Sequence, residues 1–466
     1  MPLMPPHAPS RARQMRFALA VLACGVALAP GARSFAQSPY PGSSAGDVAV
    51  PPPAASEDGF TRLGRDDSAV EGRDNAPEGP ADGAGSSNRD NGEPTGIRLG
   101  SFVLKPSLTT SLKSQKTTSG GDSAKRTFVE TGIRGTMTSD WSRHELSIVG
   151  EGLWQKNISG DLSTDPGAKI DGDLRLDLSN DTIAHITGGY ELGREDNTDP
   201  NAVSGASVQS DVMTLRGGGS VQRDLGRIRG LIGLDADRTT YSDVTLSNGS
   251  KLDLSDRDRN TATLRGRIGY ELSPALIPYL QASVGKTVYD REKDFDGYRR
   301  SSSSYALRTG LEVDLGEKLR GELGVGYENV SYEDARLTGI GALTLDGKAT
   351  WSPQRGTDVT AGLSTSVEDS TAPGESGGVV YRFNSEVAHE LRADLVARLS
   401  GATTWRRYPS GSLIANATTY EVGAGMTYKI NRYLELNGTI DYEWTKRDDG
   451  SRSNDLTAGV GLTLRR

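Results

Sequence analysis

Cysteine is almost absent from this chain, because Cys24 is the only one among 466 residues. No internal disulfide is therefore possible. Aromatic residues are also scarce, at 6% of the chain, and no run of 18 apolar residues occurs after position 36. A transmembrane helix needs about 20 such residues, so none is predicted there. The low mean hydropathy of −0.49 does not exclude a membrane protein, because in a transmembrane barrel only every second residue of a strand faces lipid.

Residues 1–36 have the features of a secretory signal peptide. A basic start is followed by an apolar stretch over residues 17–29 and by the small-x-small sequence Ser34-Phe35-Ala36. We predict cleavage between Ala36 and Gln37. A lipoprotein signal ending at Cys24 is the alternative, although the apolar stretch continues beyond that residue.

Residues 37–97 form a compositionally distinct segment, rich in Pro, Gly, Ser, Asn and Asp, with only Tyr40 and Phe60 as aromatic residues. Such a segment buries too little apolar surface to offset the entropy of ordering it. We therefore predict a disordered, acidic periplasmic segment. Removal of the four signal-peptide arginines leaves 49 basic against 61 acidic residues, a net charge of −12. This acidity argues against nucleic acid as a partner.

From residue 98 to the C-terminus, polar and apolar residues alternate in segments that are joined in turn by a tight and a long connection. The tight connections recur every 37 to 48 residues and contain turn-forming residues. They lie near Asp140, Asp181, Leu225, Ser273, Gly316, Pro353, Leu391 and Asn431. The pattern is typical of a transmembrane β-barrel with short periplasmic turns and longer extracellular loops.

We predict an all-β fold over residues 98–466: a closed antiparallel transmembrane barrel of about 18 strands, with about 16 as the alternative. Eight tight turns should alternate with nine longer loops, after a first strand at residues 99–112. The two-residue period is clearest over residues 434–445, where Leu436, Ile440 and Tyr442 share one face and Asn437 and Asp441 the other. Lipid outside and water inside explain this division.

Charged residues of both signs recur on the face assigned to the lumen. An Arg or Lys facing lipid near the midplane would cost about 2–4 kcal/mol, which supports this assignment. The pore-lining candidates are Asp171, Asp173, Arg175, Arg216, Asp235, Asp237, Arg265, Arg267, Arg320, Glu322, Arg398, Glu435, Asp441 and Glu443.

The tryptophans divide between the two ends of the predicted strands, as expected of aromatic residues at the two membrane interfaces. Trp141 and Trp351 lie at tight turns, while Trp154, Trp405 and Trp444 lie where strands enter long loops. We interpret these five residues as a membrane-interface girdle.

Three motifs that could carry other chemistry are better explained by the barrel. Gly374-Glu375-Ser376-Gly377-Gly378 matches a nucleophile elbow, but it lies in a Gly-rich loop. The histidines after the signal, His144, His185 and His389, lack metal-ligand spacing and have no cysteine to assist them. The acidic residues of 290–296 could gather calcium, although a solvated loop explains them better. We therefore predict no enzyme activity, metal or cofactor.

The stretch GIRLGSFVLKPSL at residues 96–108 resembles the opening strand of the putative beta-barrel porin 2 family of outer-membrane proteins, and the hairpin pattern over residues 98–466 is similar to that of the family. The resemblance implies a channel in the bacterial outer membrane, associated in some members with surface polysaccharide export.

The expected function is a porin-like channel for small hydrophilic solutes or for an exported surface polysaccharide. The alternative is a non-conducting barrel that anchors surface loops for adhesion or envelope organisation. The expected partners are outer-membrane lipids and lipopolysaccharide, the outer-membrane insertion machinery and periplasmic export components.

Overall fold

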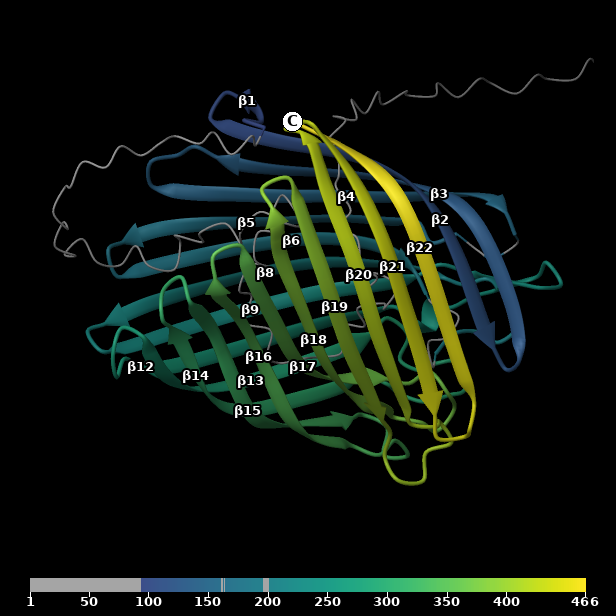
Figure 1. The fold of residues 1–466 in the computed structure, drawn as a ribbon. Helices are drawn as coiled ribbons and strands as arrows, with labels where there is room; N and C mark the ends of the chain where they lie inside the picture. The colour runs from purple at the N-terminus through teal and green to yellow at the C-terminus, as the bar shows by residue number, and fades with distance from the viewer. Residues whose placement is uncertain (1–93, 161, 163, 196–200) are drawn as a thin grey trace, which may run out of the picture.

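The computed structural model describes residues 94–160, 162, 164–195 and 201–466. The predicted signal peptide, its cleavage site at Ala36 and Gln37, and almost all of the predicted acidic segment lie outside these residues. Within them, eighteen antiparallel strands form one closed barrel, as the sequence predicted (Figure 1). The first nine barrel strands are β2 (Phe102–Ser119), β3 (Asp122–Ser139), β4 (His144–Ser159), β5 (Gly167–Ser179), β6 (Thr182–Arg194), β8 (Asp211–Leu225), β9 (Ile228–Tyr241), β12 (Arg259–Tyr270) and β13 (Leu276–Tyr289).

The second half of the barrel closes onto the first. Its strands are β14 (Ser302–Asp314), β15 (Leu319–Tyr332), β16 (Ile340–Gln354), β17 (Thr357–Asp369), β18 (Gly377–Arg392), β19 (Leu395–Arg407), β20 (Ala417–Asn431), β21 (Leu434–Arg447) and β22 (Arg452–Arg465). Closure is made by β22 against β2, from Arg465 opposite Ser107 to Ser453 opposite Ser119. The C-terminus therefore lies beside the first barrel strand, next to the short strand β1 (Ile97–Leu99) (Figure 1).

The connections at the end that carries the C-terminus are short, and all eight predicted tight turns are confirmed. The prediction of nine longer loops at the other end is wrong at two positions: β21 joins β22 through residues 448–451 alone, and β2 joins β3 through an even shorter turn. The first barrel strand continues to Ser119 and joins β3 through Gly120 and Gly121 alone, with φ angles of 61° and 99°. Two consecutive residues with positive φ make the tight turn of a two-residue hairpin, a conformation that glycine adopts without strain.

The loops between β6 and β8 and between β9 and β12 contain regular structure of their own. Strands β7 (Ala206–Val208), β10 (Val244–Leu246) and β11 (Lys251–Leu252) form a small sheet, followed by the short 3-10 helix η3 (Ser255–Arg257). Val244 of β10 is buried in one apolar cluster with Leu254, Val212 and Tyr241. Apolar packing at this mouth thus orders loops that a polar composition alone would leave mobile.

The two faces of the wall have opposite chemistry. On β12, Leu264 and Ile268 are 48% and 65% exposed, whereas Arg265 and Arg267, which alternate with them, are 4% and 8% exposed. Exposed apolar side chains recur on the outer face of other barrel strands, such as Leu280 and Val284 on β13 and Leu323, Val325 and Tyr327 on β15. This is the pattern of a wall surrounded by lipid. Among the described residues, no helix has the length and apolarity needed to cross a bilayer.

The tryptophans lie at the two ends of the strands. Trp141 follows β3 and Trp351 is near the end of β16, at the tight-turn end, whereas Trp154, Trp405 and Trp444 lie towards the other end of β4, β19 and β21. Trp444 stacks on Tyr420 with ring centroids 5.6 Å apart. We propose that these residues mark the two membrane interfaces.

Candidate functional site: the barrel lumen

The inner face of the barrel is lined by polar and charged side chains, and glycines leave room for the longest of them. Arg265, on β12, illustrates the arrangement. Its guanidinium lies over Gly233 of the neighbouring strand, where a Cβ atom would stand only 2.9 Å from Nε. Its Nη1 donates to the Asp235 carboxylate at 2.7 Å. The glycine opposite Arg265 thus lets its guanidinium lie flat against the wall.

Arg267 is the centre of the first charged cluster, on β12 to β15. Its Nη1 lies 2.8 Å from a carboxylate oxygen of Glu312 and 3.0 Å from one of Glu322, and its Nε donates to Gln281 at 2.9 Å. The guanidinium also stacks over the Tyr279 ring, 3.9 Å from its centroid. One cation is therefore shared by two carboxylates and held by an aromatic face, an arrangement that fixes its position.

Tyr279 lies flat along the wall because its neighbours are glycines. A Cβ at Gly310 would stand 2.4 Å from the Tyr279 ring, and one at Gly324 would stand 2.7 Å from its hydroxyl oxygen. The register places Tyr279, Gly310 and Gly324 in one row across three strands. These two glycines thus provide the space that orients the aromatic support of Arg267.

Arg308, on β14, forms a neighbouring group that sequence reasoning did not select. Its Nε lies 3.2 Å from Asp346 and its Nη2 lies 3.5 Å from Glu328, while Thr344 accepts a hydrogen bond from Nε at 3.1 Å. Arg308 alternates with Leu307, which is 55% exposed on the outer face. The same two-residue period that selected Arg265 would therefore have found it.

The second charged cluster lines a cavity of about 270 Å³ against β18 to β21. Arg382 makes a bidentate pair with Glu421, with both distances 3.1 Å, and Arg398 pairs with Glu386 at 2.9 Å. The predicted Asp441 and Glu443 line the same cavity. The register sets Glu443 directly between Glu421 and Asp455 of the adjacent strands. Neighbouring carboxylates repel, so this part of the wall has a negative field.

The remaining predicted residues form local pairs outside these clusters. Arg216 pairs with Glu191 at 2.6 Å, Arg175 with Asp177 at 3.0 Å, Asp173 with His185 at 3.1 Å and Asp171 with Lys169 at 3.2 Å. Arg320 and Glu435 lie near tight turns and bind Asp314 and Arg465. Asp237 faces Thr261 across the ladder. We retain all fourteen residues as proposed pore-lining residues.

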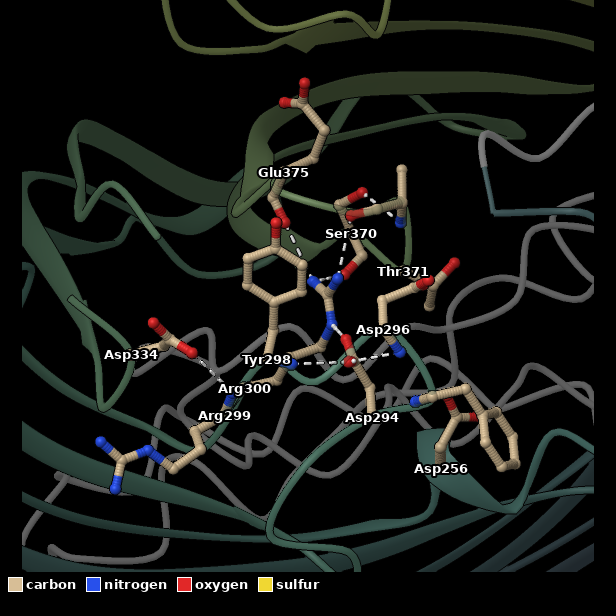
Figure 2. A network of polar contacts seen from close by, with 12 residues as sticks. Asp256, Asp294, Asp296, Tyr298, Arg299, Arg300, Asp334, Ser370, Thr371 and Glu375 are labelled. Atoms are coloured by element: carbon tan, nitrogen blue, oxygen red, sulfur yellow. Dashed lines mark hydrogen bonds and ion pairs between the residues drawn. The ribbon is translucent and has the colours of Figure 1, made fainter. Parts of the chain in front are cut away.

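The mouth with the long loops contains a further polar network that the sequence did not predict. Arg300, 5% exposed, binds the Asp294 carboxylate at 2.6 Å and the backbone carbonyls of Ser370, Ala372 and Glu375 (Figure 2). The three carbonyls belong to residues 70 to 75 positions further along the chain, in a loop without a sequence period, so the pattern of the sequence could not predict these contacts.

Two loop carboxyls near this network have perturbed acidity. The Arg336 guanidinium and backbone N–H groups hold the pKa of Asp334 well below its usual range. Burial raises the pKa of Asp256, whose carboxylate accepts a hydrogen bond from the Phe295 N–H. The first carboxyl is stabilised in its charged form and the second is penalised in it, because one is compensated by arginine and the other is withdrawn from water.

The other motifs form neither a nucleophile elbow nor a metal site in the part of the chain that the structure describes. Ser376 precedes strand β18, whereas an elbow needs a helix after the serine. No group of three or more His, Cys, Asp or Glu side chains converges there. In the acidic loop, Asp290 instead pairs with Arg238 at 2.6 Å and Asp294 with Arg300. Each of these two carboxylates is thus paired with an arginine.

Comparison with known proteins places this barrel among porins. A family model described as "Putative beta-barrel porin 2" matches residues 90–466. A search of curated protein sequences finds no match.

Several solved structures are similar in their chain trace. The outer membrane protein OpdK from Pseudomonas aeruginosa is 12% identical with a TM-score of 0.38, and the match covers 78% of this chain and 99% of that one. OccAB4 from Acinetobacter baumannii is 10% identical with a TM-score of 0.38, covering 78% and 98%. P. aeruginosa OccK2 (OpdF), solved in complex with glucuronate, is 11% identical with a TM-score of 0.39, again covering 78% and 98%.

Proposed function

This chain belongs to the Putative beta-barrel porin 2 family, and from that premise we propose that its barrel is a water-filled channel through which small hydrophilic solutes cross the outer membrane. The observation that carries the proposal is the inner face itself. Arginines and carboxylates from nearby strands meet there in ion pairs, as around Arg267 and Arg382. Such a surface is stable next to water and would be costly next to lipid.

The mixed charge suggests a channel for polar solutes of either sign. The Arg267 group and the Glu421 group both contain arginine and carboxylate side chains, so a solute would meet both signs of charge at each of these parts of the wall. Fixed charges and hydrogen-bonding groups lining a pore determine which solutes pass. Export of a surface polysaccharide is a narrower proposal that rests on the family alone, and the loop-anchoring barrel is the competing one.

Solute entry into proteoliposomes tests the proposal. The purified full chain is reconstituted, and swelling is followed in iso-osmotic solutions of a neutral monosaccharide and of a long dextran. A small-solute channel predicts swelling in the monosaccharide and none in the dextran. Protein-free vesicles and vesicles with heat-denatured protein are the controls. A barrel that only anchors loops would leave the vesicles unchanged in both solutions.

A further inference from the structure

The hairpin of β17 and β18 leaves the barrel wall at its outer end. Strand β16 pairs with β15 as far as Ile340, and β17 pairs with β18 as far as Asp369. The ladder between β16 and β17, however, stops at Gly347 opposite Leu363. Both strands continue side by side for several residues without forming the ladder, so the wall has a seam at this point.

Residues beyond the seam face the wrong way for a membrane wall. Val367 belongs by alternation to the same outer face as Leu363, which lies opposite Phe383, 41% exposed. Val367 is nevertheless only 2% exposed and packs on Val330 and Ile340. Those two residues alternate with outer-face residues of β15 and β16, so they face inward. The end of the hairpin therefore overlaps the inside of the wall and projects into the mouth.

The seam is closed by side chains in place of backbone bonds. Thr365 accepts a hydrogen bond from the Leu345 N–H at 2.8 Å and donates one to the Leu345 carbonyl at 3.0 Å. The Tyr381 hydroxyl donates to the Leu343 carbonyl at 3.0 Å. These side chains occupy backbone groups that a continued ladder would use.

Three sets of hydrogen bonds, which we call pins, hold the tip of the hairpin in place. The hydroxyl oxygens of Tyr289 and Tyr332 lie 3.2 Å and 3.1 Å from the Asp369 carboxylate. Arg300 binds three carbonyls of the tip loop (Figure 2).

The third pin comes from the opposite side of the mouth. The Asn201 amide donates to the Asp369 carbonyl at 3.0 Å and accepts from the Thr371 N–H at 2.8 Å. Asn201 lies between β6 and β8, and seven barrel strands separate it from β17 along the shorter path around the wall. The contact therefore crosses the opening.

We propose that the β17–β18 hairpin tip, residues 365–379, is a gate held closed by Arg300, Asn201 and the two tyrosines. The open state follows from the existing register. Continuing it beyond Gly347 and Leu363 would set Leu345 opposite Thr365 and Leu343 opposite Val367, with apolar residues facing outward. If the tip moved outward, it would lose the pins and the inner apolar contacts and gain ladder hydrogen bonds with β16. The hairpin tip would then have two alternative packed positions, as a gate requires. This inference goes beyond the proposed channel and rests on it.

Single-channel recording of the purified full chain tests the pins. Arg300→Gln is expected to raise the ratio of time spent in the larger conductance to time spent in the smaller one about tenfold. The reason is that hydrogen bonds to a charged group stabilise the closed state by about that factor or more. Arg299→Gln is the matched control, because the Arg299 side chain is exposed and points away from the hydrogen bonds of the neighbouring Arg300 (Figure 2). Tyr332→Phe is a milder variant that should act in the same direction, and heat-modifiable gel mobility verifies folding of each.

Disulfide trapping tests the movement without requiring conduction. Leu343→Cys combined with Val367→Cys places the two thiols on opposite faces in the closed state, where Leu343 is 55% exposed and Val367 is 2% exposed. In the continued ladder their Cα atoms would be about 4.5–5.5 Å apart, which suits a disulfide. Copper phenanthroline should form the disulfide between the two cysteines in membranes, and faster when Arg300→Gln is added. The variants with only one of the two cysteines should form no internal disulfide.

The outcomes separate the gate from the channel. A disulfide in a protein that never conducts would support the movement and contradict the channel. Conduction in the parent, unchanged in Arg300→Gln and Tyr332→Phe and without a disulfide in either background, would overturn the gate and make the hairpin a fixed part of the wall.

Discussion

Replacing Arg265 and Arg267 together by serine is expected to shift the channel severalfold towards cations. The two arginines are paired with Asp235, Glu312 and Glu322, so their removal leaves three carboxylates facing the lumen without these cations. Lumen substitutions change selectivity without the cost of lipid-facing charge. The measurement is the reversal potential across a gradient of potassium chloride. It is made in dilute salt, because the Debye length is about 10 Å at 0.1 M and shrinks in stronger salt.

The matched control for this variant removes the same charge from the outer face. Arg223 and Arg238 lie on the outer face of β8 and β9, which they share with Val221 and Leu234, 47% and 54% exposed. Arg223→Ser combined with Arg238→Ser should leave the reversal potential near that of the parent. An equal shift in both double variants would mean that the change follows total charge, not the lumen field.

Leu264→Arg is expected to destabilise the barrel by about 2–4 kcal/mol, whereas Thr263→Arg should cost much less. The two residues are adjacent on β12 and near its middle, but Leu264 is 48% exposed on the outer face and Thr263 lies on the inner face beside Asp235. An arginine at 264 would enter lipid, while one at 263 would face water and carboxylates.

Urea unfolding from lipid vesicles, followed by tryptophan fluorescence, gives the free energy of unfolding of both variants. Thr263→Arg is the control, because it adds the same side chain one residue away. Equal destabilisation by the two substitutions would contradict the assignment of the faces, and a larger effect at 263 would invert it.

The faces and the turns could be predicted from sequence because both depend on local rules. Alternation over residues 434–445 placed Leu436 outward and Asn437 inward, and their exposures of 39% and 8% agree with this. Tight turns are encoded by a few adjacent residues, such as Asn180 and Asp181. The glycine pair at 120 and 121 follows the same rule, but the predicted end of the first strand at residue 112 leaves the pair inside a longer loop, whereas the strand continues to Ser119.

The contacts at the mouth could not be predicted in this way. Val367 would be placed outward by alternation, yet it is buried inward because the hairpin departs from β16. Asn201 lies in the connection between β6 and β8, which has no sequence period, and is 168 residues from Asp369 at the end of β17. Their meeting depends on barrel closure, which brings loops together that the chain separates.

Planar-bilayer conductance of the purified full chain tests the central claim most directly. A water-filled barrel with a partly closed mouth predicts stepwise insertion of ion-conducting units, with transitions between a smaller and a larger conductance. Protein that is folded, as shown by heat-modifiable mobility, and inserted, as shown by protection from protease in vesicles, but that gives no current at any voltage would contradict the channel and favour a barrel that anchors its loops.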